Sequence, residues 1–338
     1  MKSWKLIKPN SLKFFNEEPS ELNEIKNVKV KMDKVLIAHN DILLYNNLAA
    51  ALPDMILGSI GVGVVSEVLN SEEARFSRMD RVVIEPYLAC GNCRFCKEAE
   101  YLMCTKKQQL GVNADGLLQD FISLPQKCLY GVPEALSSTN ALLAPIVSMA
   151  LNIIDKINLE KGDHVAIFGG GKLGIVLACI INYYQAVPIF VTSNADMQQI
   201  STQKNIFYTF SDNEKTNEEI FAATGGRLCE KVVYLCDGSN NIEKSIDACG
   251  INAIFCVGGS INTKCNLNLQ FIQDKNITVN SVDNCYGNFP SALNLLTNGL
   301  IKAEDFACEE LSFADLDKTI KNINEEQPLY QNIIINFE

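Results

Sequence analysis

The sequence predicts an α/β protein in which one domain is inserted into another, and three observations lead to this fold class. Residues from about 146 to 283 alternate between strand-like apolar runs and helix-like segments, the pattern of a parallel sheet with crossover helices. Residues 1–145 hold short strand-like runs separated by polar, Gly, Pro or Asp residues. The C-terminal stretch ends in a strand-like run, Asn332–Phe337, and resumes the mixed character of the first region.

The chain is long enough for two domains. Its 338 residues exceed the roughly 250–300 residues at which single cores stop growing, and its 47% hydrophobic and 20% charged residues are typical of a globular protein. We expect a β-rich domain from residues 1–147 and 284–338, and an α/β domain over residues 148–283.

The expected elements follow in chain order. In the first region, the strand-like runs are Lys34–Ala38, Gly61–Val68 and Arg81–Pro86. In the second region, strands are expected at His164–Phe168, Pro188–Thr192, Lys231–Cys236 and Asn252–Val257, with an apolar helix at Leu173–Tyr184. Helical segments near Pro290–Asn298 and Phe313–Asn324 precede the last strand.

Charge and cysteine content exclude several classes of function. The net charge of −11 and the pI near 4.9 argue against nucleic acid and against an anionic membrane surface as partners. We find no uninterrupted apolar stretch of about 18 residues, and Met1–Asn10 lacks the apolar core of a signal peptide. The 13 cysteines are odd in number and scattered through apolar runs, which favours a reducing, cytoplasmic location over a disulfide framework. With only two histidines, chemistry that needs imidazole has few candidate residues.

A glycine-rich turn indicates a dinucleotide site. Gly169, Gly171 and Gly174 match G-x-G-x-x-G, with Lys172 and Leu173 between them, at a point where a strand gives way to a helix. The first glycine allows the turn, the second lets the backbone approach a pyrophosphate, and the third permits close packing of helix on strand. The alternative is a glycine-rich turn without a ligand.

The acidic residue that usually supports such a turn is missing. NAD enzymes carry Asp or Glu at the end of the second strand, where this chain has Thr192, Ser193 and Asn194. The small Ser193 side chain leaves room for a 2′-phosphate, but no basic residue follows until Lys204. The choice between NAD and NADP stays open, with NADP favoured.

Four clustered cysteines predict a metal site. Cys90, Cys93, Cys96 and Cys104 are separated by three, three and eight positions, a spacing that can close a tetrahedral zinc site within one loop. Four thiolates leave no open coordination position, so we expect one structural zinc rather than a catalytic one. Four unrelated thiols are the alternative, and the other nine cysteines are expected to be buried apolar residues.

Motifs along nearly the whole chain resemble the zinc-containing medium-chain dehydrogenase/reductase family, which includes alcohol, polyol and threonine dehydrogenases. The segments that resemble the family's L-G-H-E-x-x-G-x-V, G-D-R-V, D-G-G-F-A-E-Y, I-E-P and K-P-G-D motifs are residues 56–65, 79–82, 115–121, 143–145 and 161–163. The loop at residues 90–104 is similar to the family's structural zinc lobe.

The resemblance carries several implications. It implies a GroES-like domain formed by both termini, an inserted Rossmann domain, and an active site in the cleft between them. It also implies NAD or NADP as coenzyme, a small-molecule substrate, and a homodimer or homotetramer.

The chain departs from the family at the catalytic zinc. The family's C-[GH]-[ST]-D reads Ala38-His39-Asn40-Asp41 here, its G-H-E reads Gly58-Ser59-Ile60, and its E-P reads Ala144-Pro145. A lone serine hydroxyl does not hold zinc, and aliphatic side chains cannot ligate it at all. We therefore expect no catalytic zinc.

Three residues remain as candidates for catalysis. His39 could act as general acid, because an imidazole exchanges a proton near neutral pH. Asp41 is expected to orient neighbouring groups, as its counterpart does in the family, and Ser59 to fill the vacated metal site. The alternative for His39 is a polar loop residue without a catalytic role.

Three functions compete on this basis. The first is an NAD(P)-dependent dehydrogenase or reductase that acts, without catalytic zinc, on the carbonyl or alcohol of a polyol- or sugar-like metabolite. The second is a non-catalytic paralogue that serves as a binding or regulatory subunit. The third is a non-redox lyase or isomerase on the same scaffold.

Overall fold

The computed structural model describes residues 1–18, 21–49, 52, 54–69, 74–235, 242–259 and 265–337. It divides into two compact units. Unit 1 contains Met1–Pro145, Leu293–Asn298 and Lys302–Glu338, and unit 2 contains Ile146–Ala292 and Gly299–Ile301. The second unit is therefore an insertion in the chain of the first, as the sequence predicts.

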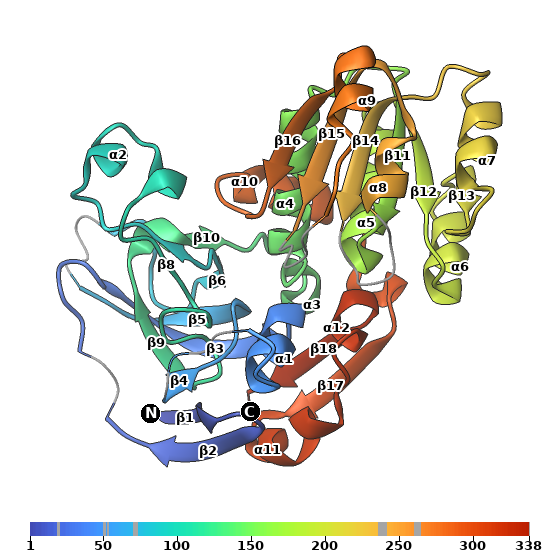
Figure 1. The fold of residues 1–338 in the computed structure, drawn as a ribbon. Coiled ribbons are helices and arrows are strands. Elements are labelled where there is room, and N and C mark those ends of the chain that lie inside the picture. The colour runs from blue at the N-terminus through green and yellow to red at the C-terminus, as the bar shows by residue number, and fades with distance from the viewer. Residues whose placement is uncertain are drawn as a thin grey trace. The chain divides into compact units, whose positions relative to one another are not determined.

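Unit 1 is rich in β-structure (Figure 1). Its largest sheet has the order β10-β6-β5-β3-β18-β17, with β9 also paired to β3. The C-terminal strand β18 lies antiparallel to β3, so both chain ends build one sheet. The strands of this sheet are β3 Val28–Leu36, β5 Ile60–Val68, β6 Arg81–Ile84, β9 Phe121–Leu124, β10 Leu129–Gly131, β17 Cys308–Ser312 and β18 Asn332–Asn336. Smaller sheets join β1 Lys2–Lys8, β2 Ser11–Asn16 and β4 Met55–Ile56, and pair β7 Tyr87–Leu88 with β8 Gln108–Gln109.

Unit 2 is built on a parallel sheet of six strands with the order β13-β12-β11-β14-β15-β16. Counted in chain order, this arrangement is 3-2-1-4-5-6, the strand order of the dinucleotide-binding Rossmann fold. Its strands are β11 His164–Gly169, β12 Val187–Val191, β13 Tyr208–Phe210, β14 Cys229–Leu235, β15 Cys249–Gly258 and β16 Thr278–Val282. The fully buried Phe168, Phe190 and Phe255 show why these strands read as continuous apolar runs: helices cover both faces.

The helices fall into two groups. Those in or next to the first unit are α1 His39–Tyr45, α2 Arg94–Lys97, α3 Ser138–Ala141, α11 Leu316–Thr319 and α12 Gln327–Tyr330. The remainder are α4 Ala144–Ile157, α5 Gly171–Tyr183, α6 Ala195–Gln203, α7 Thr216–Ala223, α8 Ile242–Ile246, α9 Leu269–Asp274 and α10 Phe289–Thr297. The second half of α10, from Leu293, belongs to unit 1.

Residues 284–292 lie in unit 2, whereas the sequence predicts them in the first domain. The cause is a set of hydrogen bonds to helix α4. The Ser148 hydroxyl donates to the carbonyl of Cys285 at 2.6 Å, and the Asn152 amide donates to the carbonyls of Asn284 and Tyr286 at 3.0 and 3.1 Å.

One local expectation differs from the structure. The helix expected at Phe313–Asn324 is broken into a 3-10 turn at Phe313–Asp315, the short α11, and a second 3-10 turn at Ile320–Asn322. Its apolar residues pack into the unit 1 core from separate short turns, so their spacing does not report one continuous helix. In addition, the helical stretch Ser138–Ile157 is long and apolar enough to cross a membrane by composition alone, but 67% of it is buried inside the protein. Such burial is typical of a core helix.

Candidate functional site

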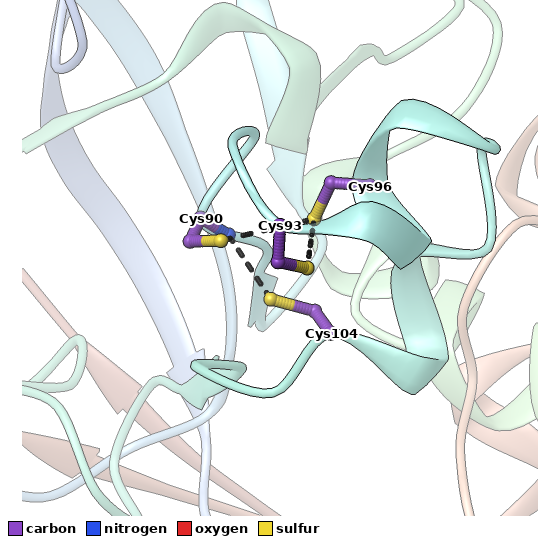
Figure 2. A group of neighbouring side chains, drawn as sticks. All are labelled: Cys90, Cys93, Cys96 and Cys104. Atoms are coloured by element: carbon purple, nitrogen blue, oxygen red, sulfur yellow. Dashed lines mark hydrogen bonds between the residues drawn. The ribbon is translucent and has the colours of Figure 1, made fainter.

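Four cysteine sulfurs converge at one point in unit 1 (Figure 2). The Sγ atoms of Cys90, Cys93, Cys96 and Cys104 all lie within 4.8 Å of one another. The Cys93–Cys96 and Cys90–Cys96 sulfur distances are 3.5 and 3.9 Å. Four sulfurs held tetrahedrally at about 2.3 Å from a zinc ion would lie about 3.8 Å apart, so the cluster has the size of a zinc site.

Short local elements place these sulfurs. Cys90 follows strand β7, Cys93 caps the N-terminus of α2, and Cys96 lies within that helix. Cys104 ends a 3-10 turn, Tyr101–Met103, and its sulfur accepts a hydrogen bond from the Cys90 backbone at 3.3 Å. Helical turns of four and three residues do not hold together by themselves, so this lobe needs a cross-link.

The surroundings of the cluster shift the pKa values of its thiols in opposite directions. The backbone N–H of Cys96 lowers the pKa of the Cys93 thiol to about 6, and the N–H of Asn92 lowers that of Cys90. Burial, followed by the nearby Cys93, raises the pKa of Cys96 to about 12. Four neighbouring thiolates therefore resist ionising together unless a cation shares the site, which is the condition that zinc meets.

The glycine turn of unit 2 has the backbone of a dinucleotide site. Gly169, Gly170 and Gly171 all have positive φ angles of 75°, 83° and 50°, and α5 begins at Gly171. The turn therefore ends in a helix N-terminus, where backbone N–H groups can receive a phosphate. Lys172 is buried and Leu173 is half-buried in the first turn of α5.

Gly174 performs the packing role that the sequence predicts. A Cβ at this position would lie 2.4 Å from the carbonyl oxygen of Gly169 and 2.7 Å from the ring of Phe190. No larger side chain fits without moving α5 away from the sheet.

We predict that Gly174→Ala lowers the free energy of unfolding by about 2–3 kcal/mol, because the methyl group overlaps backbone and a core ring. Chemical denaturation measures this change. Gly131→Ala is the matched control, since its Cβ would meet only the Phe76 ring, at 4.0 Å. Equal stability of the two variants would contradict the prediction.

The end of β12 shows what replaces the missing acidic residue. Ser193 is exposed, and its hydroxyl donates to the carbonyl of Asp212 at 3.5 Å. The Asp212 carboxylate binds the ammonium of Lys244 at 2.7 Å, and that ammonium also contacts the Asn213 carbonyl and the Thr216 hydroxyl. The nearby carboxylate and ammonium are therefore engaged with each other, and Ser193 is left as the exposed side chain.

The candidate catalytic residues lie in two adjacent segments of unit 1. His39 and Asp41 belong to α1, and Ser59 precedes β5. The segments meet because Leu36 pairs with Ile60 in the β3–β5 ladder. Ser59 is 9% exposed, whereas Asp41 is 1% exposed.

Asp41 connects these two segments. One carboxylate oxygen accepts the backbone N–H of Ala38 at 2.8 Å, and the other accepts the backbone N–H of Gly58 at 2.9 Å. Burial raises the pKa of Asp41 to about 6, and the two hydrogen bonds oppose this shift. Both oxygens are occupied, so the geometry suits a positioning role.

Three glycines bring the backbone together beside Ser59. A Cβ on Gly111 would lie 2.8 Å from Gly58 backbone atoms, and one on Gly116 would lie 2.4 Å from the Gly58 carbonyl oxygen. Gly58 itself has a φ of +94°. Gly116 is part of a motif noted in the sequence, but Gly111 carries no such signal.

His39 has a partner that sequence reasoning missed. Its Nδ1 lies 2.7 Å from the carbonyl oxygen of Glu325, in the C-terminal part of unit 1. A carbonyl can only accept, so Nδ1 carries the proton and donates it, which leaves Nε2 of the neutral ring as an acceptor. No sequence pattern links two residues that are 286 positions apart.

The residues that the resemblance places at the catalytic zinc ligands lie in separate elements. Ala38 caps α1, Ile60 begins β5, and Ala144 is fully buried at the start of α4, after a helix, α3, that packs on β3 and β5. Within the described ranges, the four cysteines are the group of three or more His, Cys, Asp or Glu side chains that could hold a metal ion. The aliphatic side chains of Ala38, Ile60 and Ala144 offer no ligand atom for zinc.

Comparison with known proteins finds relatives among alcohol and polyol dehydrogenases. Residues 24–134 match the model of the alcohol dehydrogenase GroES-like domain. An uncharacterized zinc-type alcohol dehydrogenase-like protein of Haemophilus influenzae is 25% identical over 333 residues, covering 97% of this chain and 96% of that protein. Sorbitol dehydrogenase of Bacillus subtilis is 24% identical over 262 residues, covering 76% and 74% of the two chains.

Solved structures share the whole fold. The crystal structure of a protein described as short chain alcohol dehydrogenase (rspB) from E. coli CFT073, complexed with NADH, superimposes with a TM-score of 0.88. It is 21% identical and covers 100% of this chain and 99% of its own. The GroES-like domain, the Rossmann sheet and relatives that match along nearly their whole length together support the zinc-type, alcohol dehydrogenase-like medium-chain dehydrogenase/reductase family.

Proposed function

We propose that this protein is an NAD(P)-dependent oxidoreductase that acts on an alcohol or carbonyl of a small polyol- or sugar-like metabolite without a catalytic zinc. The coenzyme is supported by the glycine turn before α5 and by the NADH found in a structural neighbour. The substrate class is supported by relatives named sorbitol dehydrogenase and D-xylulose reductase.

One observation carries the zinc-independent part of the proposal. Ala38, Ser59, Ile60 and Ala144 stand where the resemblance places the family's zinc ligands. Asp41 binds the backbone at Ala38 and Gly58, and Gly111 and Gly116 pack on Gly58. These backbone contacts are present although the side chains that bind zinc in the family are absent from this chain. Replacement of the metal site explains this combination better than a general decay of the region.

Different residues of the chain would bind the coenzyme and move the substrate proton. Gly169, Gly171 and the first turn of α5, with Lys172, Leu173 and Gly174, would hold the coenzyme pyrophosphate, and Ser193 would face the ribose. A bound nicotinamide supplies or accepts the hydride. His39 would hold or release the substrate proton at Nε2, because its Nδ1 is committed to Glu325.

The remaining Asp41 and Ser59 would act indirectly. Asp41 would keep α1 and the segment before β5 together, and Ser59 would fill the vacated position with a small hydroxyl. We further propose one structural zinc on Cys90, Cys93, Cys96 and Cys104, a homodimer or homotetramer, and a cytoplasmic location. The location is supported by the free thiols of the described cysteines.

The decisive experiment is elemental analysis of protein purified without added zinc, combined with coenzyme titration. We expect one zinc per chain, and binding of NADH or NADPH with a Kd below about 100 μM. A carbonyl-dependent oxidation of the bound coenzyme should follow with an acceptable substrate. Two zinc ions per chain would overturn the zinc-independent mechanism, and failure to bind either coenzyme would overturn the oxidoreductase.

A second candidate is a non-catalytic binding or regulatory subunit. The observation that favours it is the ribose end of the coenzyme site, where Ser193 is exposed and the Asp212–Lys244 pair is already engaged. This candidate predicts association with an active partner and no turnover of the isolated chain. Turnover by the isolated protein would exclude it.

A further inference from the structure

A second candidate site lies in unit 1, and none of the candidate catalytic, coenzyme-binding or metal-binding residues lines it. It is a cavity of about 380 Å³, lined by residues from strands β1, β2, β3, β9, β17 and β18 and from the turn after β17. The volume falls at the lower end of the roughly 300–1,000 Å³ that small-molecule sites occupy. Four phenylalanines line it, and we name it the phenylalanine cavity: Phe14, Phe121, Phe313 and Phe337.

The walls of this cavity are held in place before any ligand arrives. Phe313 and Phe337 stack with ring centroids 4.3 Å apart. The indole N–H of Trp4 donates to the Phe313 carbonyl at 2.7 Å, and the Trp4 ring meets Phe14 edge to face at 5.3 Å. Phe14 nevertheless stays 43% exposed. A preformed apolar wall with one exposed ring is a feature of binding sites.

Charge decides what kind of molecule the cavity suits. Lys2 and Lys31 both line it, and neither ammonium has a hydrogen bond or an ion pair in the described parts of the chain. Asp120 is the opposing charge, and one of its oxygens accepts the backbone N–H of Lys2 at 2.8 Å. With two lysines and one aspartate, the side chains that line the cavity carry a net charge of +1 next to the four phenylalanine rings.

We infer that the phenylalanine cavity binds a small amphiphilic anion, an aromatic or short acyl carboxylate, with its apolar body on the phenylalanines and its carboxylate between Lys2 and Lys31. The buried Met32, 1% exposed, and Phe313, 8% exposed, provide the apolar floor. A carboxylate at the rim would neutralise the unbalanced charge and stay partly hydrated, so it avoids the cost of full burial. This site does not depend on the proposed oxidoreductase function.

The chain carries its own reporter for this site. Trp4 is the single tryptophan of the sequence and contacts two of the cavity's phenylalanine residues. Tryptophan fluorescence therefore reports on the surroundings of Trp4, next to the phenylalanine cavity. Phenylbutyrate is a suitable probe, with phenylbutanol and phenylbutylamine as neutral and cationic molecules of the same shape.

The expected result is a saturable change in Trp4 fluorescence with phenylbutyrate, at a Kd below about 500 μM. Phenylbutanol and phenylbutylamine should bind at least about tenfold more weakly, because they lack the charge that the lysines attract. Lys31→Glu and Lys2→Glu should each weaken phenylbutyrate binding by about tenfold. Lys8→Glu is the matched control, an exposed lysine of β1 that does not line the cavity, and it should leave the Kd unchanged.

Several outcomes would overturn the inference. They are no fluorescence change at millimolar phenylbutyrate, equal binding of the alcohol or the amine, or equal losses in the Lys8→Glu and Lys31→Glu proteins. Binding that weakens with protein concentration as copies associate would show a second copy of the chain as the occupant instead. Because the variants change exposed lysines, circular dichroism spectra should be unaltered, so a lost response reports on binding rather than folding.

Discussion

Replacing Cys96 with serine is expected to remove the zinc from the protein and to loosen the lobe at residues 90–104. The lobe contains two helical turns of four and three residues, and it has no core large enough to replace the metal. Three thiolates and a serine hydroxyl bind zinc far more weakly than four thiolates. We expect less than about 0.2 zinc per chain and a loss of about 3 kcal/mol or more in unfolding free energy, which lowers Tm by roughly 6–12 °C.

Elemental analysis, thermal denaturation and limited proteolysis measure this prediction. Cleavage should appear within residues 90–104 of the Cys96→Ser protein and in the chelator-treated wild type. Cys265→Ser is the matched control, because it makes the same chemical change at an exposed thiol outside the cluster. A Cys96→Ser protein with its zinc and its Tm intact would refute the structural role of the metal.

Replacing Asp41 with alanine is the second large effect, because it leaves two backbone N–H groups without their acceptor. The N–H of Ala38 loses a bond of 2.8 Å, and the N–H of Gly58 loses one of 2.9 Å in a buried position. Removing a buried, charged acceptor from two donors costs about 2–4 kcal/mol. Asp115→Ala is the matched control, since Asp115 accepts the N–H of Ile56 at 3.2 Å from an exposed position and should cost about 1 kcal/mol.

The loss of unfolding free energy caused by Asp41→Ala should depend on pH. Burial of Asp41 decides whether this loss grows or shrinks as the pH rises. Burial raises the pKa of Asp41 from 3.8 to about 6, so the folded state holds the proton more tightly than the unfolded state does. The stability that protonation contributes is complete below about pH 3.8 and is lost as the pH rises through about 6. The difference in unfolding free energy between wild type and Asp41→Ala should therefore shrink by about 2 kcal/mol between about pH 4.5 and about pH 7.5.

Urea denaturation at several pH values checks this sign. A difference that grows with pH would mean that the two hydrogen bonds outweigh burial and hold the pKa of Asp41 below its usual range. Activity measured on the same proteins separates positioning from catalysis. A positioning role predicts that Asp41→Ala and Gly116→Ala impair turnover together, because both disturb the backbone of Gly58.

Much of the parallel sheet of unit 2 and the lobe at residues 90–104 could be predicted from the sequence. Strands such as His164–Gly169 are covered by helices, so their residues are apolar without interruption and are recognisable without knowledge of their neighbours. The turn at Gly169–Gly174 and the loop from Cys90 to Cys104 are local structures, in which a few adjacent residues supply the whole geometry. The short β13 and the edge strand β16 lack such signals and were not predicted.

The catalytic region shows where sequence reasoning ends. The identities of Ala38, Ser59, Ile60 and Ala144 predict the loss of a metal site, since ligand chemistry belongs to side chains. The partner of His39 could not be predicted, because the carbonyl of Glu325 is an unremarkable backbone group brought into position by the pairing of β3 with β18. The contact of Gly111 and Gly116 with Gly58 also depends on chain segments that meet only in the fold.

The sequence by itself determined the α/β class and the inserted domain, and it located the four clustered cysteines and the glycine turn, because each is encoded in local pattern or spacing. Only the tertiary structure decided the occupied oxygens of Asp41, the tautomer of His39 and the phenylalanine cavity. The cavity draws Phe14 from β2, Phe121 from β9 and Phe337 from beyond β18, which are far apart in the chain. Long-range pairing of strands creates such sites, and no periodicity within one segment records it.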